Sequence, residues 1–124
     1  MIRLLIADDE KLEREALADM VSRRFEHEVV LELAENGRKA ADTAVLGGAD
    51  LILMDMKMPN LDGIDATRII RELAPDIPII ALTAYAYEHD KQAALKAGCN
   101  DFLTKPFTQE VLKETIKKWL DDKG

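Results

Sequence analysis

The sequence predicts an α/β domain in which helices cover both faces of a parallel sheet. Apolar runs that are too short for helices alternate with longer segments whose apolar residues recur at helical spacing. The segments between them are short, and many contain the turn residues Gly, Pro, Asn or Asp. Strands that follow one another through helices in this way pair in parallel, with right-handed crossovers.

Three strands and two helices are predicted in the first half of the chain. Ile2–Ala7 is a mostly apolar strand, and apolar residues at helical spacing across residues 12–25 predict the helix after it. Residues 28–34 alternate only partly, which suits a strand at a sheet edge. A short alanine-rich helix follows at residues 40–45. Leu51–Asp55 begins as an unbroken apolar run and ends in an acid, which predicts a strand buried on both faces.

Two strands and three helices are predicted in the second half. Residues 62–73 carry apolar side chains at helical spacing, the last of them Leu73. Residues 77–82 form another apolar run, which the prolines around its start separate from the preceding helix. The remaining elements are a helix at Glu88–Ala97, a short strand at residues 99–103 and a last helix across residues 108–120 that Thr108 caps.

Length and composition restrict the possible classes of protein. The 124 residues fit one domain, and we expect no output domain in the chain. The formal net charge of −7 argues against direct binding of nucleic acid, because phosphate contacts need a basic surface. No apolar run approaches the roughly 20 residues of a membrane helix, so no membrane contact is expected. A lone Cys99 and no signal peptide suggest the cytoplasm.

Four of the five predicted strands end at residues whose side chains can take part in chemistry. Asp8 and Asp9 follow the first strand, Asp55 ends the third, Thr83 follows the fourth and Lys105 follows the fifth. The carboxyl ends of parallel strands lie at one edge of the sheet, where ligands bind. We therefore expect these residues to form one site.

The residue types at this edge favour phosphoryl transfer. Three carboxylates held together repel one another, and a divalent cation such as Mg²⁺ relieves that repulsion through oxygen ligands. Asp55 can act as a nucleophile and become an aspartyl phosphate. Lys105 offers a positive charge and Thr83 a hydroxyl to the phosphoryl oxygens. Each residue also has a structural alternative, since Asp8 or Asp9 could cap a helix and Lys105 could pair with an acid.

Four motifs resemble the receiver domains of response regulators in two-component signalling. The resemblance covers essentially the whole chain, and it implies a flavodoxin-like (βα)5 three-layer sandwich with strand order 2-1-3-4-5. The motifs are D-D-E at residues 8–10, D-M-K-M-P-N-L-D-G at 55–63, L-T-A at 82–84 and K-P-F at 105–107.

This resemblance implies that Asp55 accepts a phosphoryl group from a histidine kinase or a histidine phosphotransfer protein. It also implies that Mg²⁺ is held by Asp9, Asp55 and the backbone carbonyl of Lys57, with Asp8 acting mainly through a metal-bound water. The domain would assist its own phosphorylation and dephosphorylation without being an enzyme that turns over an external metabolite.

The resemblance further implies how the signal leaves the site. Thr83 and Lys105 would bind the phosphoryl group, and the Lys105–Pro106 bond would be cis. Thr83 would then move, and Phe102 on the fifth strand would turn inward and alter the face of the fourth helix, fifth strand and fifth helix. Core packing is the alternative role for Phe102. Expected partners are a downstream effector or a fused output domain, and a phosphorylation-dependent homodimer is possible.

Three other functions compete with this interpretation. A haloacid-dehalogenase-like phosphatase needs a second acid two residues after the nucleophile, where this chain has Lys57. A flavin or nucleotide binder needs a glycine-rich phosphate loop after the first strand, where this chain has Asp8 and Asp9. A pure interaction module that takes no phosphate stays open, although the complete set of strand-end residues argues against it.

Overall fold

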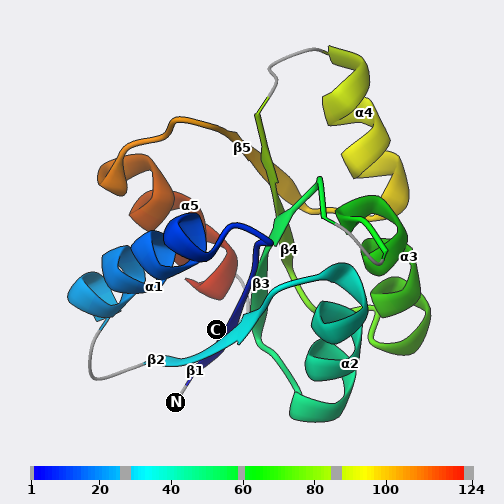
Figure 1. The fold of residues 1–124 in the computed structure, drawn as a ribbon, viewed down its shortest axis with the longest axis horizontal. Helices are drawn as coiled ribbons and strands as arrows, with labels where there is room; N and C mark the ends of the chain where they lie inside the picture. The colour runs from blue at the N-terminus through cyan, green and yellow to red at the C-terminus, as the bar shows by residue number, and fades with distance from the viewer. Residues whose placement is uncertain (1, 26–28, 59–60, 85–87, 122–124) are drawn as a thin grey trace.

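The structure is a computed structural model that describes residues 2–25, 29–58, 61–84 and 88–121. Five strands alternate with five helices along these residues, as the sequence predicts (Figure 1). The strands are β1 Ile2–Ala7, β2 Val29–Ala34, β3 Leu51–Asp55, β4 Ile79–Thr83 and β5 Asp101–Thr104. The helices are α1 Lys11–Phe25, α2 Gly37–Gly47, α3 Gly63–Leu73, α4 Glu88–Ala97 and α5 Gln109–Asp121.

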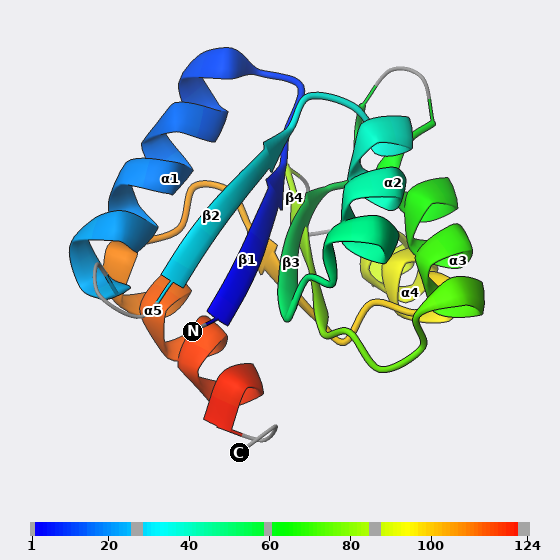
Figure 2. The same cartoon turned by 90° about the horizontal axis from the view of Figure 1, so that it is seen from below.

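All strands pair in parallel, and their order is β2-β1-β3-β4-β5. This order confirms the predicted topology, in which the chain first adds a strand on one side of β1 and then extends the sheet on the other side. Helices α1 and α5 cover one face of the sheet, while α2, α3 and α4 cover the other (Figures 1 and 2). The arrangement is the expected sandwich of three layers.

The sheet separates two hydrophobic cores, because successive side chains of a strand point to opposite faces. Leu5 of β1 packs in the core on the side of α2 and α3, whereas its neighbours Leu4 and Ile6 pack with residues of α1 and α5. Every residue of β3 and β4 is buried, which confirms that these strands are enclosed on both faces. The rigid core therefore fixes where the carboxyl ends of these strands lie.

Two predicted strands begin later than expected, because another part of the chain binds the backbone just before each strand. The Ile77 carbonyl accepts from Arg71 Nη1 at 2.7 Å, and β4 begins at Ile79 instead of residue 77. The Cys99 N–H donates to the Ala94 carbonyl at the end of α4. β5 therefore begins at Asp101 instead of residue 99.

Polar side chains begin three of the helices. Asn36 accepts from the Lys39 N–H, Asp62 accepts from the Asp65 N–H, and Thr108 accepts from the Val111 N–H at 3.1 Å. The last of these confirms Thr108 as the cap of the final helix. Glu28, at the start of one predicted strand, and Pro59 and Asn60, within one motif, lie outside the described residues.

Two leucines that helical spacing places with the apolar faces of their helices are exposed instead. Leu12 is 80% exposed and Leu73 is 63% exposed. Both lie in a terminal turn of their helix, where spacing alone does not determine burial. Within the described part of the chain, no helix combines the length and apolar character needed to cross a membrane.

Candidate functional site

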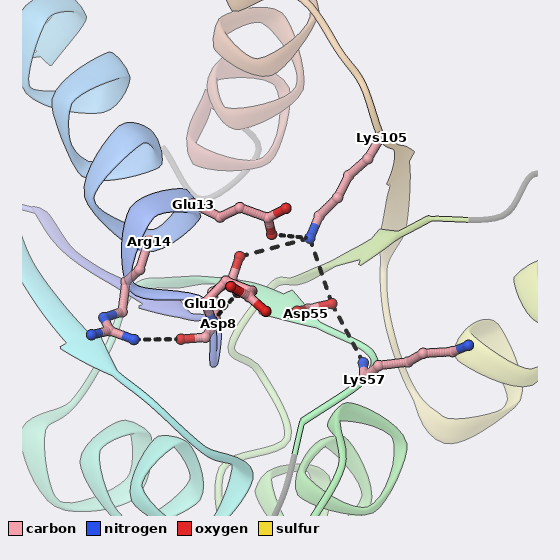
Figure 3. A network of polar contacts seen from close by, with 7 residues as sticks. All are labelled: Asp8, Glu10, Glu13, Arg14, Asp55, Lys57 and Lys105. Atoms are coloured by element: carbon pink, nitrogen blue, oxygen red, sulfur yellow. Dashed lines mark hydrogen bonds and ion pairs between the residues drawn. The ribbon is translucent and has the colours of Figure 1, made fainter.

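The strand ends bring the predicted site residues together at the carboxyl edge of the sheet. Figure 3 shows Asp8, Asp55 and Lys105 among them. One carboxylate oxygen from each of Asp8, Asp9 and Asp55 lies within 4.8 Å of the other two. Lys105 Nζ is 3.7 Å from Asp8 Oδ2 and 3.7 Å from Asp55 Oδ1. Thr83 lines the same cavity, of about 450 Å³, as Asp9, Asp55 and Lys105. Residues far apart in sequence thus share one cleft.

Asp55 lines this cavity at the end of a strand that is buried along its whole length. The Lys57 N–H donates to Asp55 Oδ1 at 3.4 Å. Burial raises the pKa of the Asp55 carboxyl, and the charge of Lys105 together with the Lys57 N–H opposes that rise. The side chain of Lys57 points away from Asp55 in Figure 3, so its backbone is the part that faces the acid.

Asp8 is the most deeply buried of the three acids, with 0% of its side chain exposed. Its Oδ1 accepts from the Glu10 N–H at 2.9 Å, whereas its Oδ2 is a buried atom without a hydrogen-bond partner among the described residues. Burial raises the pKa of Asp8 to about 7, against the Glu10 N–H and the charge of Lys105. Arg14 Nη1 donates to the Asp8 carbonyl at 2.8 Å and anchors this loop.

The three acids meet the requirements of a divalent cation that prefers oxygen ligands. They place several carboxylate oxygens together, and one of these, Asp8 Oδ2, is buried without a hydrogen bond to any residue that the structure describes. A buried polar atom left in this way costs free energy, and a cation would recover that cost. The donor set therefore fits Mg²⁺, which binds carboxylate oxygens and water.

Lys105 makes its shortest contact with an acid that the sequence reasoning missed. Its Nζ donates to Glu13 Oε2 at 2.9 Å, across 92 positions of sequence. Burial alone would lower the pKa of Lys105, but the hydrogen bond to Glu13 and the charges of Asp55 and Asp8 outweigh it and raise that pKa. The same hydrogen bond lowers the pKa of Glu13. The only signal in the sequence was an acid within a few residues of the first strand end.

Thr83 and Phe102 occupy the positions at which a switch is predicted. Thr83 is buried at the end of β4, and its backbone carbonyl accepts from the Lys105 N–H at 2.8 Å. Phe102 is partly buried and packs against the core under α2 and α3, while Lys91 Nζ lies 4.9 Å from the centre of its ring. The switch role of both residues stays a prediction. The Lys105–Pro106 bond is cis, as the resemblance implied.

Comparisons with known proteins agree with this geometry. The family model described as the response regulator receiver domain matches residues 4–117. Response regulator MprA of Mycolicibacterium vanbaalenii is 37% identical over 119 residues, which are 96% of this chain and 50% of that protein. The chain thus spans about half the length of the curated MprA proteins that it matches.

Solved structures of similar sequence have the same fold. The receiver domain of sensor histidine kinase PA1611 from Pseudomonas aeruginosa, described with a magnesium ion in the active-site cleft, has a TM-score of 0.87 and 35% identity. The match covers 97% of this chain and 98% of that one. The receiver domain of Saccharomyces cerevisiae Ssk1, crystallised with the histidine phosphotransfer protein Ypd1, has a TM-score of 0.86 and 35% identity, with coverages of 95% and 88%.

The strand order also matches that of the flavodoxin-like receiver fold, which confirms the predicted fold class. Fold, family model and curated relatives agree over nearly all of the chain. The chain belongs to the response-regulator receiver domain family of two-component signalling.

Proposed function

We propose that the domain accepts a phosphoryl group on Asp55 from the phosphohistidine of a histidine kinase or a histidine phosphotransfer protein. The observation that carries the proposal is a cleft in which Asp55 lies beside both the cation Lys105 and two further acids. An Asp55 oxygen would form the new bond to phosphorus while the phosphorus–nitrogen bond breaks. The histidine nitrogen would leave with the bonding electrons and take up a proton.

Mg²⁺ is the proposed cofactor, held by Asp9, Asp55 and the Lys57 carbonyl, with Asp8 acting mainly through a bound water. The cluster of acids and the buried Asp8 Oδ2 support this assignment. The related PA1611 receiver domain is described with magnesium in its active-site cleft. When bound, the ion would offset the acidic charge and attract phosphoryl oxygens to the cleft.

The protein's own residues would position the transferred group. Lys105 Nζ lies 3.7 Å from Asp55 Oδ1, which is close enough to reach an oxygen of a group attached there. Thr83, from the neighbouring strand, lines the same cavity and would donate its hydroxyl. The domain would assist only its own phosphorylation and dephosphorylation and would turn over no external metabolite.

The output would pass through the face formed by α4, β5 and α5. Thr83 would move toward the phosphoryl group, and Phe102 would turn inward from β5, which shifts an equilibrium between two packings. A downstream effector or a fused output domain would read this face, and a phosphorylation-dependent homodimer would use it as well. The negative charge of the domain supports a protein partner over nucleic acid. We place the domain and this partner in the cytoplasm as part of the proposal.

Intact-protein mass after incubation with acetyl phosphate and Mg²⁺ tests the proposal. We expect a gain of one phosphoryl group in the wild-type protein. The gain should be absent in Asp55→Asn, which keeps the size of the side chain but removes the nucleophile, and absent when EDTA removes the metal. A wild-type protein that gains no phosphoryl from acetyl phosphate or from a histidine phosphotransfer protein would refute the proposal.

A further inference from the structure

Lys105 is shared among carboxylates that come from three different elements. Its Nζ is 2.9 Å from Glu13 of α1 but 3.7 Å from both Asp8, after β1, and Asp55 of β3. Figure 3 shows the ammonium group between Glu13 and Asp55, with the Glu13 carboxylate nearer. The one hydrogen bond that Lys105 donates in this set goes to the residue outside the predicted phosphoryl site.

We propose that Glu13 is a positioning residue that competes with the phosphoryl group for Lys105 and so favours the unphosphorylated domain. This inference rests on the proposed function, because it concerns the regulation of the same site. Lys105 Nζ donates to Glu13 at 2.9 Å and lies 3.7 Å from Asp55 Oδ1, so a hydrogen bond to an oxygen on phosphorylated Asp55 would draw the ammonium group from Glu13 toward β3. The contact with Glu13 is then weakened or lost, and that loss opposes phosphorylation.

The charges at the site determine whether Glu13 weakens or strengthens the binding of a phosphoryl group. A phosphoryl group brings about two negative charges and several strong acceptor oxygens to Asp55. Glu13 would then become an unpaired carboxylate close to those charges. Removing Glu13 should therefore tighten the binding of a phosphoryl group, whereas a Glu13 that merely stabilised the active position of Lys105 would have the opposite effect.

The size of the effect follows from the exposure of the pair. Glu13 is 51% exposed and Lys105 is 23% exposed, so water screens the interaction in part. Ion pairs of this kind usually change an equilibrium by about two- to fivefold. Glu13 lies in the first turn of α1, outside both hydrophobic cores, and its replacement leaves the packing of the sheet intact.

Three substitutions separate the contact from the charge. Glu13→Gln removes the charge and keeps the length of the side chain. Glu13→Asp keeps the charge but is one methylene shorter, so it loses reach toward Lys105. Glu10→Gln removes the same charge from the neighbouring loop, where the Glu10 backbone N–H donates to Asp8 and the Glu10 side chain is exposed.

The experiment titrates the 124-residue protein and each variant with beryllium fluoride, a phosphoryl mimic, at fixed Mg²⁺ and follows amide NMR signals. We expect Glu13→Gln and Glu13→Asp to bind the mimic about two- to fivefold more tightly than the wild type, with Glu10→Gln within about 1.5-fold of it. Urea unfolding of each variant checks that the fold is retained.

Several results would overturn the inference. Unchanged or weaker binding of the mimic by Glu13→Gln would rule out the competition. An equal gain in affinity in Glu10→Gln would assign the effect to local negative charge in general. If the wild type binds the mimic normally, these results leave the proposed function standing. If neither the wild type nor any variant binds the mimic or gains phosphoryl, the proposed function falls and this inference falls with it.

Discussion

Replacing Asp8 by Asn should stabilise the metal-free domain, although Asp8 is a predicted site residue. Asp8 is fully buried, and burial raises its pKa from 3.8 to about 7. The folded protein therefore holds this proton more tightly than the unfolded chain does. Stability from this group is complete below about pH 4 and is lost as the pH rises through about 7.

The size of the expected gain follows from that shift. At about 1.4 kcal/mol per pKa unit, a rise from 3.8 to about 7 corresponds to about 4 kcal/mol at pH 8. At pH 5 the carboxyl is mostly protonated in the folded state, and the same shift corresponds to only about 2 kcal/mol. Asn keeps an oxygen for the Glu10 N–H and turns an amide toward Asp55 in place of a charge.

Urea unfolding in EDTA, followed by far-ultraviolet circular dichroism at pH 5 and pH 8, measures these differences. We expect Asp8→Asn to raise the free energy of unfolding by up to about 4 kcal/mol at pH 8 and by about half of that at pH 5. Asp42→Asn, an exposed acid on α2, is the matched control and should change stability by less than about 0.5 kcal/mol. Equal stability of Asp8→Asn and wild type at pH 8 would refute the reasoning.

Three further predictions concern Mg²⁺ binding, the backbone beside Asp55 and the segments that precede β4 and β5. Mg²⁺ should bind about tenfold more weakly at pH 6 than at pH 8 by calorimetry, because it has to displace the proton of Asp8. Gly63→Ala should destabilise the domain by more than about 2 kcal/mol, because its new Cβ would lie 2.3 Å from the Asp55 carbonyl oxygen. Arg71→Lys should cost about 2 kcal/mol in urea unfolding, because Arg71 donates to three backbone carbonyls that a lysine cannot reach together.

Each of these predictions has a contrary result, and the two substitutions also have matched controls. Equal Mg²⁺ affinity at the two pH values would contradict the link to Asp8. Gly47→Ala should be tolerated, since the atoms nearest its Cβ belong to the flexible Glu32 side chain, the first at 3.2 Å. An equal loss of stability in both glycine variants would contradict the steric argument. Arg68→Lys alters an exposed ion pair, so a loss as large as that of Arg71→Lys would contradict the role of the carbonyl contacts.

The strand-end residues could be predicted from sequence because the topology determines their placement. Once five strands alternate with helices, the carboxyl ends of β1, β3, β4 and β5 have to share an edge of the sheet. Asp8, Asp55 and Lys105 follow directly from that geometry. Lys105 Nζ lies 3.7 Å from both Asp8 Oδ2 and Asp55 Oδ1, as expected of a common site.

Glu13 could not be predicted in the same way. Helical spacing assigns it to the charged outer face of α1, and only the length and direction of the Lys105 side chain bring the two together. The late starts of β4 and β5 have a similar origin, because Arg71 and the end of α4 bind backbone groups before those strands. Hydrogen bonds to the backbone just before a strand leave no periodic signal in the sequence.

The central claim is that Asp55 itself receives the phosphoryl group, and chemical trapping tests it most directly. After incubation with acetyl phosphate and Mg²⁺, borohydride reduces an aspartyl phosphate to homoserine, which peptide mass spectrometry can locate. We predict homoserine at position 55 and at no other acid, with none in the presence of EDTA. Homoserine at Asp8 or Asp9, or an unmodified Asp55 in protein that has gained phosphoryl mass, would contradict the account.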